Sequence, residues 1–230
     1  MKKDFKFPNK IPVFPLSNFI IFPNTTVPLN IFEPRYIQMV DDCMKGDRLI
    51  GMVQPKKTGD LKKPNLYQVG CVGKITSFNE TEDGRYLIIL NGICRYKIID
   101  EITNDKLYRE CKINFEDYIN DLNENKKEEV NISDLKFIFN NLKNLFEKEG
   151  YLIDWKDLEK QKLDQTINTL SMASPFSLEE KQILLTTNTL MERKKKLEEI
   201  LKIYTCAKYI IIMLNFVFKI NKQSLIHFQS

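Results

Sequence analysis

The chain has 230 residues, of which 43% are hydrophobic and 11% aromatic, so it is long enough to bury a core in one domain or two small ones. A charged fraction of 29% and a net charge of +4 mark it neither as disordered nor as a nucleic-acid binder. Residues 1–10 lack the apolar core of a secretory signal, and the apolar run at Tyr209–Leu214 is too short to span a bilayer, so we expect a cytoplasmic protein with no membrane partner.

Strand-like alternation dominates the chain up to a polar stretch at residues 120–129. Ile11–Leu16 is predicted to be an edge strand, where prolines are tolerated. Pro34 fits the first turn of a helix that ends near Gly46. Further strands are predicted at Val27–Ile31, Leu49–Val53, Val69–Phe78, Arg85–Leu90 and Cys111–Phe115, with a basic loop over Pro55–Pro64.

The dipeptide Asn91-Gly92 can be interpreted in two ways. It suits the turn of a second hairpin, or a sharp bend in one long strand that runs on to Ile99. Many short strands around one helix predict a small closed or half-closed barrel.

Helical periodicity follows the polar stretch. One apolar stripe runs from Leu135 to Phe146, with Ser133 as a candidate cap and Gly150 as its end. Ser177 with Glu180 has the spacing of a capping box. Other helices are predicted at Trp155–Lys160, Leu163–Leu170 and Leu190–Tyr204.

Several motifs, taken in order, resemble the N-terminal substrate-recognition domain of Lon proteases and its short, protease-free bacterial relatives. The first half supplies Val13–Leu16, Phe22–Pro23, Pro28–Tyr36, Gly70–Ile75, Asp83–Tyr86 and Leu90–Tyr96. The second half supplies Ser174–Ser177, Glu180–Gln182, Leu184–Leu185 and Arg193.

The resemblance implies an α+β fold: a PUA-like β pseudo-barrel with one inserted helix over residues 9–118, then a C-terminal helical bundle over residues 130–220. It favours the long bent strand at Gly92. It also implies a non-enzymatic module that binds unfolded or peptide segments of other proteins, as an adaptor in protein quality control. A Lon-type protease or a second copy of the chain is a candidate partner.

Catalytic motifs are missing from the sequence. Gly46 and Gly51 have P-loop spacing, but Met52-Val53 replaces the lysine and hydroxyl that handle phosphate and Mg²⁺. A Ser–Lys dyad with Lys181 is disfavoured because Ser177 is better explained as a helix cap. The single histidine, His227, and five scattered cysteines show no ligand spacing. We therefore predict no enzyme activity, no cofactor and no metal.

The apolar loop Phe19-Ile20-Ile21-Phe22-Pro23 is the first candidate peptide-binding site. An exposed loop of Phe19, Ile20, Phe22 and Pro23 would contact extended, unfolded chain. The alternative is that these residues pack in the core, as most large apolar residues do. The tail at residues 208–230, rich in Ile and Phe, suits a core helix or a dimer contact.

A second set of residues follows the pattern of the family and has a structural interpretation. Glu33, Arg35 and Tyr36 suit the start of a helix with an ion pair. The other members of this structural set are Gly73, Gly92 and Arg95.

RNA binding is the alternative function, because PUA-like folds elsewhere bind RNA. Its candidate residues lie in the basic loop: Lys56, Lys57, Lys62 and Lys63. Solvated charge is the simpler interpretation, since aromatic residues are not interleaved with these lysines. Nucleic acid is therefore not the favoured partner.

Overall fold

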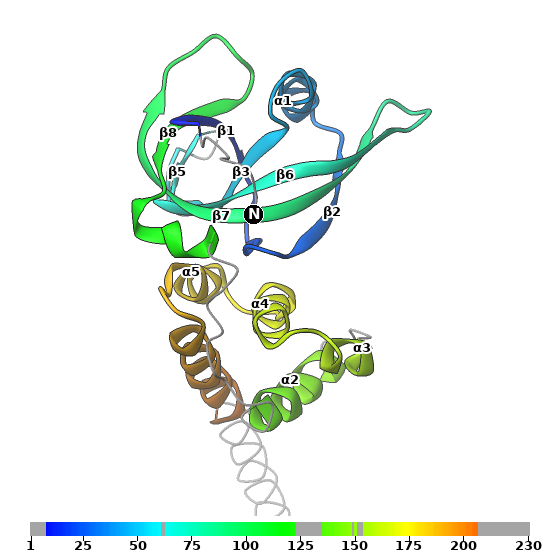
Figure 1. Ribbon diagram of the computed structural model, residues 1–230, viewed down its shortest axis with the longest axis vertical. Helices are drawn as coiled ribbons and strands as arrows, with labels where there is room; N and C mark the ends of the chain where they lie inside the picture. Colours follow the sequence, from blue (N-terminus) through cyan, green and yellow to red (C-terminus); the bar gives the residue numbers. More distant parts are fainter. Residues whose placement is uncertain (1–7, 61–62, 123–134, 149, 151–153, 207–230) are drawn as a thin grey trace, which may run out of the picture.

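The computed structural model describes residues 8–60, 63–122, 135–148, 150 and 154–206 (Figure 1). A curved sheet with helix α1 forms one half of the molecule, and helices form the other half. The fold is therefore mixed α and β. Four of the sequence predictions lie outside the described residues: the helix cap Ser133, the histidine His227, Lys62 and the apolar tail at 208–230. The helix at residues 190–206, which precedes the tail, is described.

Six strands build the main sheet in the order β2-β7-β6-β3-β1-β8, and β7 also pairs with β8. The pairings of β7, β6, β3, β1 and β8 therefore close into a ring, while β2 lies outside it along β7. The strands are β1 Lys10–Pro15, β2 Thr26–Ile31, β3 Leu49–Val53, β6 Val69–Glu80, β7 Tyr86–Ile102 and β8 Arg109–Asn114.

Strand β7 is one continuous element of 17 residues, so the long bent strand is confirmed and the second hairpin at Asn91-Gly92 is not formed. Gly92 lies beside a shift in the register of β6 and β7, and its backbone pairs with Asn24 and Thr25 in the segment that precedes β2. A Cβ at this position would overlap the carbonyl oxygen of Phe22, so only glycine permits the close approach.

Two strand predictions were wrong. Strand β1 lies between β3 and β8 and is no edge strand. Its two prolines each lie beside only one paired strand. The pairing of β1 with β3 begins at Val13, after Pro12, and the pairing with β8 ends at Val13, before Pro15. The predicted basic loop contains a small antiparallel pair, β4 Pro55–Gly59 and β5 Pro64–Leu66.

Helix α1, Pro34–Met44, begins at the predicted proline and buries Tyr36, Met39, Val40 and Cys43 against the sheet. The second half holds α2 Lys136–Lys148, α3 Trp155–Glu159, α4 Leu163–Ala173 and α5 Leu178–Thr186, and residues 190–206 are also helical. Ser177 and Glu180 form the predicted capping box of α5. A short 3-10 segment, η1 Glu116–Leu122, lies between the two halves in the chain.

Strand β2 is an edge of the sheet, since β7 is its one neighbour among the described strands. Gly92 donates its N–H to the Thr25 carbonyl, so the odd-numbered residues of β2 face β7. The even-numbered residues, Thr26, Pro28 and Asn30, therefore direct their backbone groups to the open edge. Pro28 removes the central donor from that edge.

Candidate functional site

The segment Phe19–Pro23 joins the two halves of the molecule. Ile20 and Phe22 are 2% and 0% exposed and pack among the helices, whereas Ile21 packs into the core of the sheet. Pro23 is buried and Phe19 is half-buried. The exposed surface that the first peptide-binding hypothesis requires is therefore not formed by Ile20, Phe22 and Pro23. The packing alternative describes them, because one apolar segment has to fill two cores.

Two buried arginines complete this junction, which we define as the contact of Phe22, Arg95 and Arg193 with the end of α5. Arg95 from β7 forms a two-pronged ion pair with Asp121, at 2.7 Å from Nη2 to Oδ1 and 2.8 Å from Nε to Oδ2. It also donates from Nη1 to the Leu185 carbonyl at 3.0 Å and lies over the Tyr118 ring.

Arg193 approaches the same helix end from the C-terminal helix. Its Nε donates to the Leu184 carbonyl at 3.2 Å, its Nη1 donates to Asn168 Oδ1 at 2.7 Å, and its guanidinium lies 4.2 Å from the Phe22 ring centroid. Both arginines thus satisfy carbonyls that the last turn of a helix leaves unpaired. Their role in the fold is to fix the helices to the sheet.

Two serines that precede Lys181 in the sequence donate their hydroxyl groups to carbonyls of α4. Ser171 and Ser174 donate to the carbonyls of Ile167 and Leu170, at 2.7 and 2.5 Å. Lys181 Nζ donates to the Asn18 carbonyl at 3.0 Å, and burial lowers the pKa of this ammonium group. Among the described residues, no group of three or more His, Cys, Asp or Glu side chains is placed to hold a metal ion.

An exposed apolar surface lies on the side of β7 that faces away from the core. Leu87 and Ile89 are 45% and 38% exposed, and they alternate with Ile88 and Leu90, which are buried. Leu87 pairs with Asn30 on β2 and Asn79 on β6, while Ile89 pairs with Pro28 and Ser77. We define the outer face as Leu87, Ile89, their paired neighbours on β2 and β6, and Phe32. Phe32 lies one position beyond β2 and is 65% exposed.

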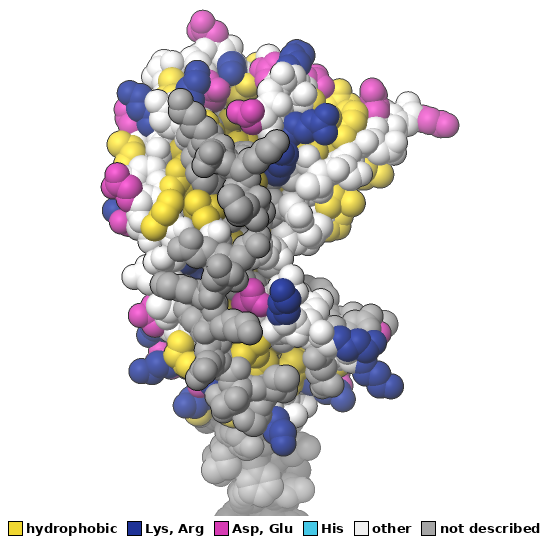
Figure 2. All heavy atoms as spheres, viewed as in Figure 1, with side chains coloured by type: hydrophobic (Ala, Val, Ile, Leu, Met, Phe, Trp, Pro, Cys, Tyr) yellow, Lys and Arg dark blue, Asp and Glu magenta, His cyan; other side chains and the backbone are white. Residues whose placement is uncertain are grey.

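The outer face ends in a polar hollow of about 680 Å³ at the tip of the β6–β7 hairpin, and its lining includes Leu87 and Asn30. Figure 2 shows acidic side chains at this projecting tip and hydrophobic side chains along the hairpin behind it. Glu80, Glu82 and Asp83 line the hollow, and Arg85 forms an ion pair with Asp83 at 2.9 Å. A polar rim around a small apolar surface is typical of a protein-binding site.

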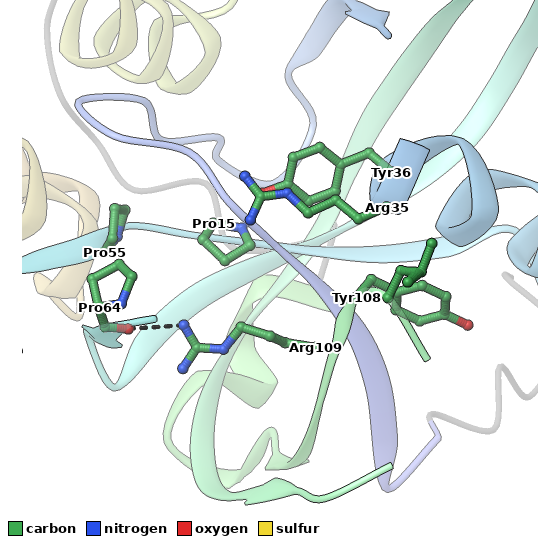
Figure 3. Close-up of a pocket in the computed structure, with 8 residues that line it drawn as sticks. Pro15, Arg35, Tyr36, Pro55, Pro64, Tyr108 and Arg109 are labelled. Atoms are coloured by element: carbon green, nitrogen blue, oxygen red, sulfur yellow. Dashed lines mark hydrogen bonds between the residues drawn. The ribbon is translucent and has the colours of Figure 1, made fainter. Parts of the chain in front are cut away.

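A pocket of about 480 Å³ lies beside the start of α1, at one end of the strand ring (Figure 3). Arg35 and Arg109 reach this pocket from α1 and β8, and the Arg35 guanidinium lies near Pro15, whereas the Arg109 guanidinium points toward Pro64. We call it the proline pocket. Its lining is Pro15, Arg35, Tyr36, Pro55, Pro64, Leu107, Tyr108 and Arg109.

Three of the four candidate RNA-binding lysines lie among the described residues, and two of them have carboxylate partners. Lys57 lies 3.1 Å from Glu179, and Lys63 lies 2.9 Å from Glu101. Lys56 lies over the Tyr67 ring, 5.7 Å from its centroid. Sequence reasoning missed the outer face. Its signal is the continuous apolar run Tyr86–Leu90, because a strand with this sequence carries apolar residues on both of its faces.

The model of the ATP-dependent protease La (LON) substrate-binding domain family matches residues 10–203. The Lon protease of Flavobacterium johnsoniae is 28% identical over 199 residues, which are 82% of this chain and 23% of that protein. The Lon protease of Syntrophus aciditrophicus is 25% identical over 209 residues, which are 85% of this chain and 25% of that protein. The chain thus spans about a quarter of the length of these relatives.

Two solved structures are similar in fold. A Lon N-terminal domain protein from Xanthomonas campestris has a TM-score of 0.57 and 19% identity, covering 84% of this chain and 97% of that one. The N-terminal domain of a Mycobacterium avium complex Lon protease has a TM-score of 0.56 and 15% identity, covering 84% and 98%. Among the described residues, no helix has the length and apolar character to cross a membrane.

Proposed function

The chain belongs to the Lon substrate-binding domain family, and from this premise we propose that it binds extended apolar segments of other proteins through its outer face, without catalysing a reaction. The exposure of Leu87 and Ile89 on a strand whose alternate residues are fully buried carries this proposal. A row of apolar side chains on a rigid strand gives an unfolded segment a place to bury its own apolar groups. The family match supports the same role.

The finer assignments are part of the same proposal. The strand ring is a PUA-like barrel over residues 9–118, and the described helices between residues 135 and 206 form a separate helical bundle. The protein acts in the cytoplasm as an adaptor in protein quality control, with a Lon-type protease or a second copy as its partner. Both partners would use a surface that leaves the outer face open to the client.

The test is fluorescence anisotropy of a labelled, permanently unfolded polypeptide titrated with the protein. Replacing Leu87 and Ile89 together with serine should weaken binding about tenfold or more, since about 1.4 kcal/mol of lost apolar burial corresponds to that factor. Ile99→Ser is the matched control, because Ile99 is 60% exposed on the same strand and lies outside the outer face. Equal affinity of the double variant and the wild type would contradict the proposal.

A labelled RNA oligomer tests the alternative in parallel. RNA binding that falls steeply with salt and weakens in Lys56→Glu with Lys57→Glu would move the site to the basic loop. Salt-tolerant binding to the polypeptide alone supports the outer face.

A further inference from the structure

The proline pocket has walls that supply carbon surface and few hydrogen-bond donors. Pro15, Pro55 and Pro64 line it, and proline has no backbone N–H group. Tyr36 adds a ring that is 5% exposed as a residue and packs on Phe14 with 4.1 Å between centroids. Tyr108 donates its hydroxyl to Asp42 at 2.8 Å and points away from the pocket (Figure 3). The Arg35 guanidinium carbon lies over the Tyr36 ring, 4.6 Å from its centroid, so the apolar part of a ligand would rest on the proline rings.

The donors of the pocket are concentrated in two guanidinium groups. Each arginine carries five N–H groups. Arg35 uses Nε and Nη2 on a single oxygen of Glu33, at 2.9 and 2.7 Å, and its side chain is 49% exposed. Among the described residues, its Nη1 has no hydrogen-bond acceptor. Arg35 therefore presents donors to whatever occupies the pocket.

Arg109 adds positive charge from the opposite wall. Its Nε donates to Glu101 at 3.0 Å and its Nη1 donates to the Pro64 carbonyl at 2.8 Å. Lys63 also pairs with Glu101 at 2.9 Å, so two cations share one carboxylate. Partial burial raises the pKa of Glu101, but the hydrogen bonds and charges of Arg109 and Lys63 outweigh it, and the pKa lies below its ordinary value. Because Arg109 shares this carboxylate with Lys63, Glu101 offsets the charge of Arg109 only in part, and the remainder can attract an anion.

We propose that the proline pocket binds the carboxyl-terminal residue of a protein chain that ends in an apolar side chain. The side chain rests on Pro15, Pro55 and Pro64, and the terminal carboxylate accepts hydrogen bonds from Arg35, assisted by the charge of Arg109. This proposal rests on the proposed function and deepens it, because it selects chain ends among the extended segments that the outer face takes.

The experiment compares three labelled glycine- and serine-rich peptides by anisotropy. One ends in leucine with a free carboxylate, the second is its carboxyl-terminal amide, and the third is an amide with an aspartate beside the leucine. The free acid should bind the wild-type protein about tenfold more tightly than either amide, because the charge-assisted hydrogen bonding of the terminal carboxylate is lost in both. Equal binding of the acid and its amide would overturn the proposal.

Arg35→Gln should remove the preference for the free acid. Lys196→Gln should keep it, and it is a matched control because Lys196 also forms an exposed ion pair, with Glu199 three residues away, and its side chain is 48% exposed. If the aspartate amide binds as tightly as the free acid, a side-chain carboxylate suffices and recognition of chain ends is wrong. A preference that persists in Arg35→Gln also contradicts the proposal.

The outer-face variant separates this inference from the proposed function. The protein with serine at positions 87 and 89 should keep the preference for the free acid, because the proline pocket is lined by other residues. If that variant no longer binds the unfolded polypeptide while the wild type binds the acid and the amide peptides equally, the inference about the proline pocket fails and the proposed function stands. If the acid preference is present but the variant binds the unfolded polypeptide normally, the proposed function of the outer face fails instead.

Discussion

The junction and the outer face use the same strand for opposite purposes. Gly92 and Arg95 lie near the middle of β7, and both are buried where the sheet meets the helices. Leu87 and Ile89 lie on its first half, with their side chains exposed. At the junction, space admits only glycine at position 92 and ionic contacts hold Arg95, whereas we expect the exposed positions on the outer face to tolerate change. Residues that hold the fold and residues free to bind can thus be separated by their environment.

The largest effect is expected from Gly92→Val, which places side-chain atoms against the Phe22 carbonyl and Ile21. Backbone has to move on both sides of the junction, so the free energy of unfolding should fall by about 4 kcal/mol or more. Urea denaturation followed by circular dichroism measures it. Gly84→Val is the control for loss of a glycine, since a Cβ at Gly84 meets nothing within 4 Å although its φ is +77°. A smaller loss at Gly92 than at Gly84 would break the comparison.

Arg95→Met comes next. The change removes the guanidinium donors from Asp121 and the Leu185 carbonyl, at a site where the Arg95 side chain is 3% exposed, and leaves Asp121 with the backbone N–H of residue 95. Breaking one partner of a buried ion pair costs about 3–5 kcal/mol. The paired change Arg95→Met with Asp121→Leu should recover part of that loss, and denaturation of all three proteins tests it. No recovery would show that the carbonyl contacts, and not the ion pair, dominate at the junction.

Lys181→Met should be neutral or stabilising by about 1 kcal/mol, because it removes a buried charge whose one donated bond is to the Asn18 carbonyl. Burial lowers the pKa of Lys181 from 10.5. The folded state therefore resists protonation, and the cost is present at neutral pH and disappears as pH rises toward the unfolded value. The gain from Met should shrink between the folded-state pKa and pH 10.5. A gain that grows with pH would contradict this sign.

The smallest change in stability is expected from Leu87→Ser, within about 0.5–1 kcal/mol, since its side chain already contacts solvent. The same variant should bind the unfolded polypeptide several-fold more weakly. A large loss of stability would place Leu87 with the junction and remove the distinction drawn between the two regions.

Much of the fold follows from the sequence, because its signals are local. Pro34 and Gly46 frame α1, Ser177 with Glu180 starts α5, and the short apolar segment Leu49–Val53 gives β3 its observed bounds. The β4–β5 pair was missed because its strands are polar and short.

The candidate site was harder to predict from the sequence. Phe19–Pro23 is apolar throughout, and no pattern within it shows that Ile21 faces one core while Ile20 and Phe22 face another. The outer face depends on which side of β7 is covered, and the proline pocket joins residues from five elements and the segment before β8. Such sets are brought together by topology, which local periodicity does not determine.

Pro28 limits the polymerisation of this protein at high concentration. A client-binding surface beside an open strand edge is also a template on which copies of the same protein could polymerise. Strand growth needs an uninterrupted series of donors, and the proline breaks that series at the middle of β2 while leaving the neighbouring Ile89 exposed. Because Pro28 has no backbone N–H group, the apolar outer face can stay available to clients while self-assembly through the β2 edge is blocked.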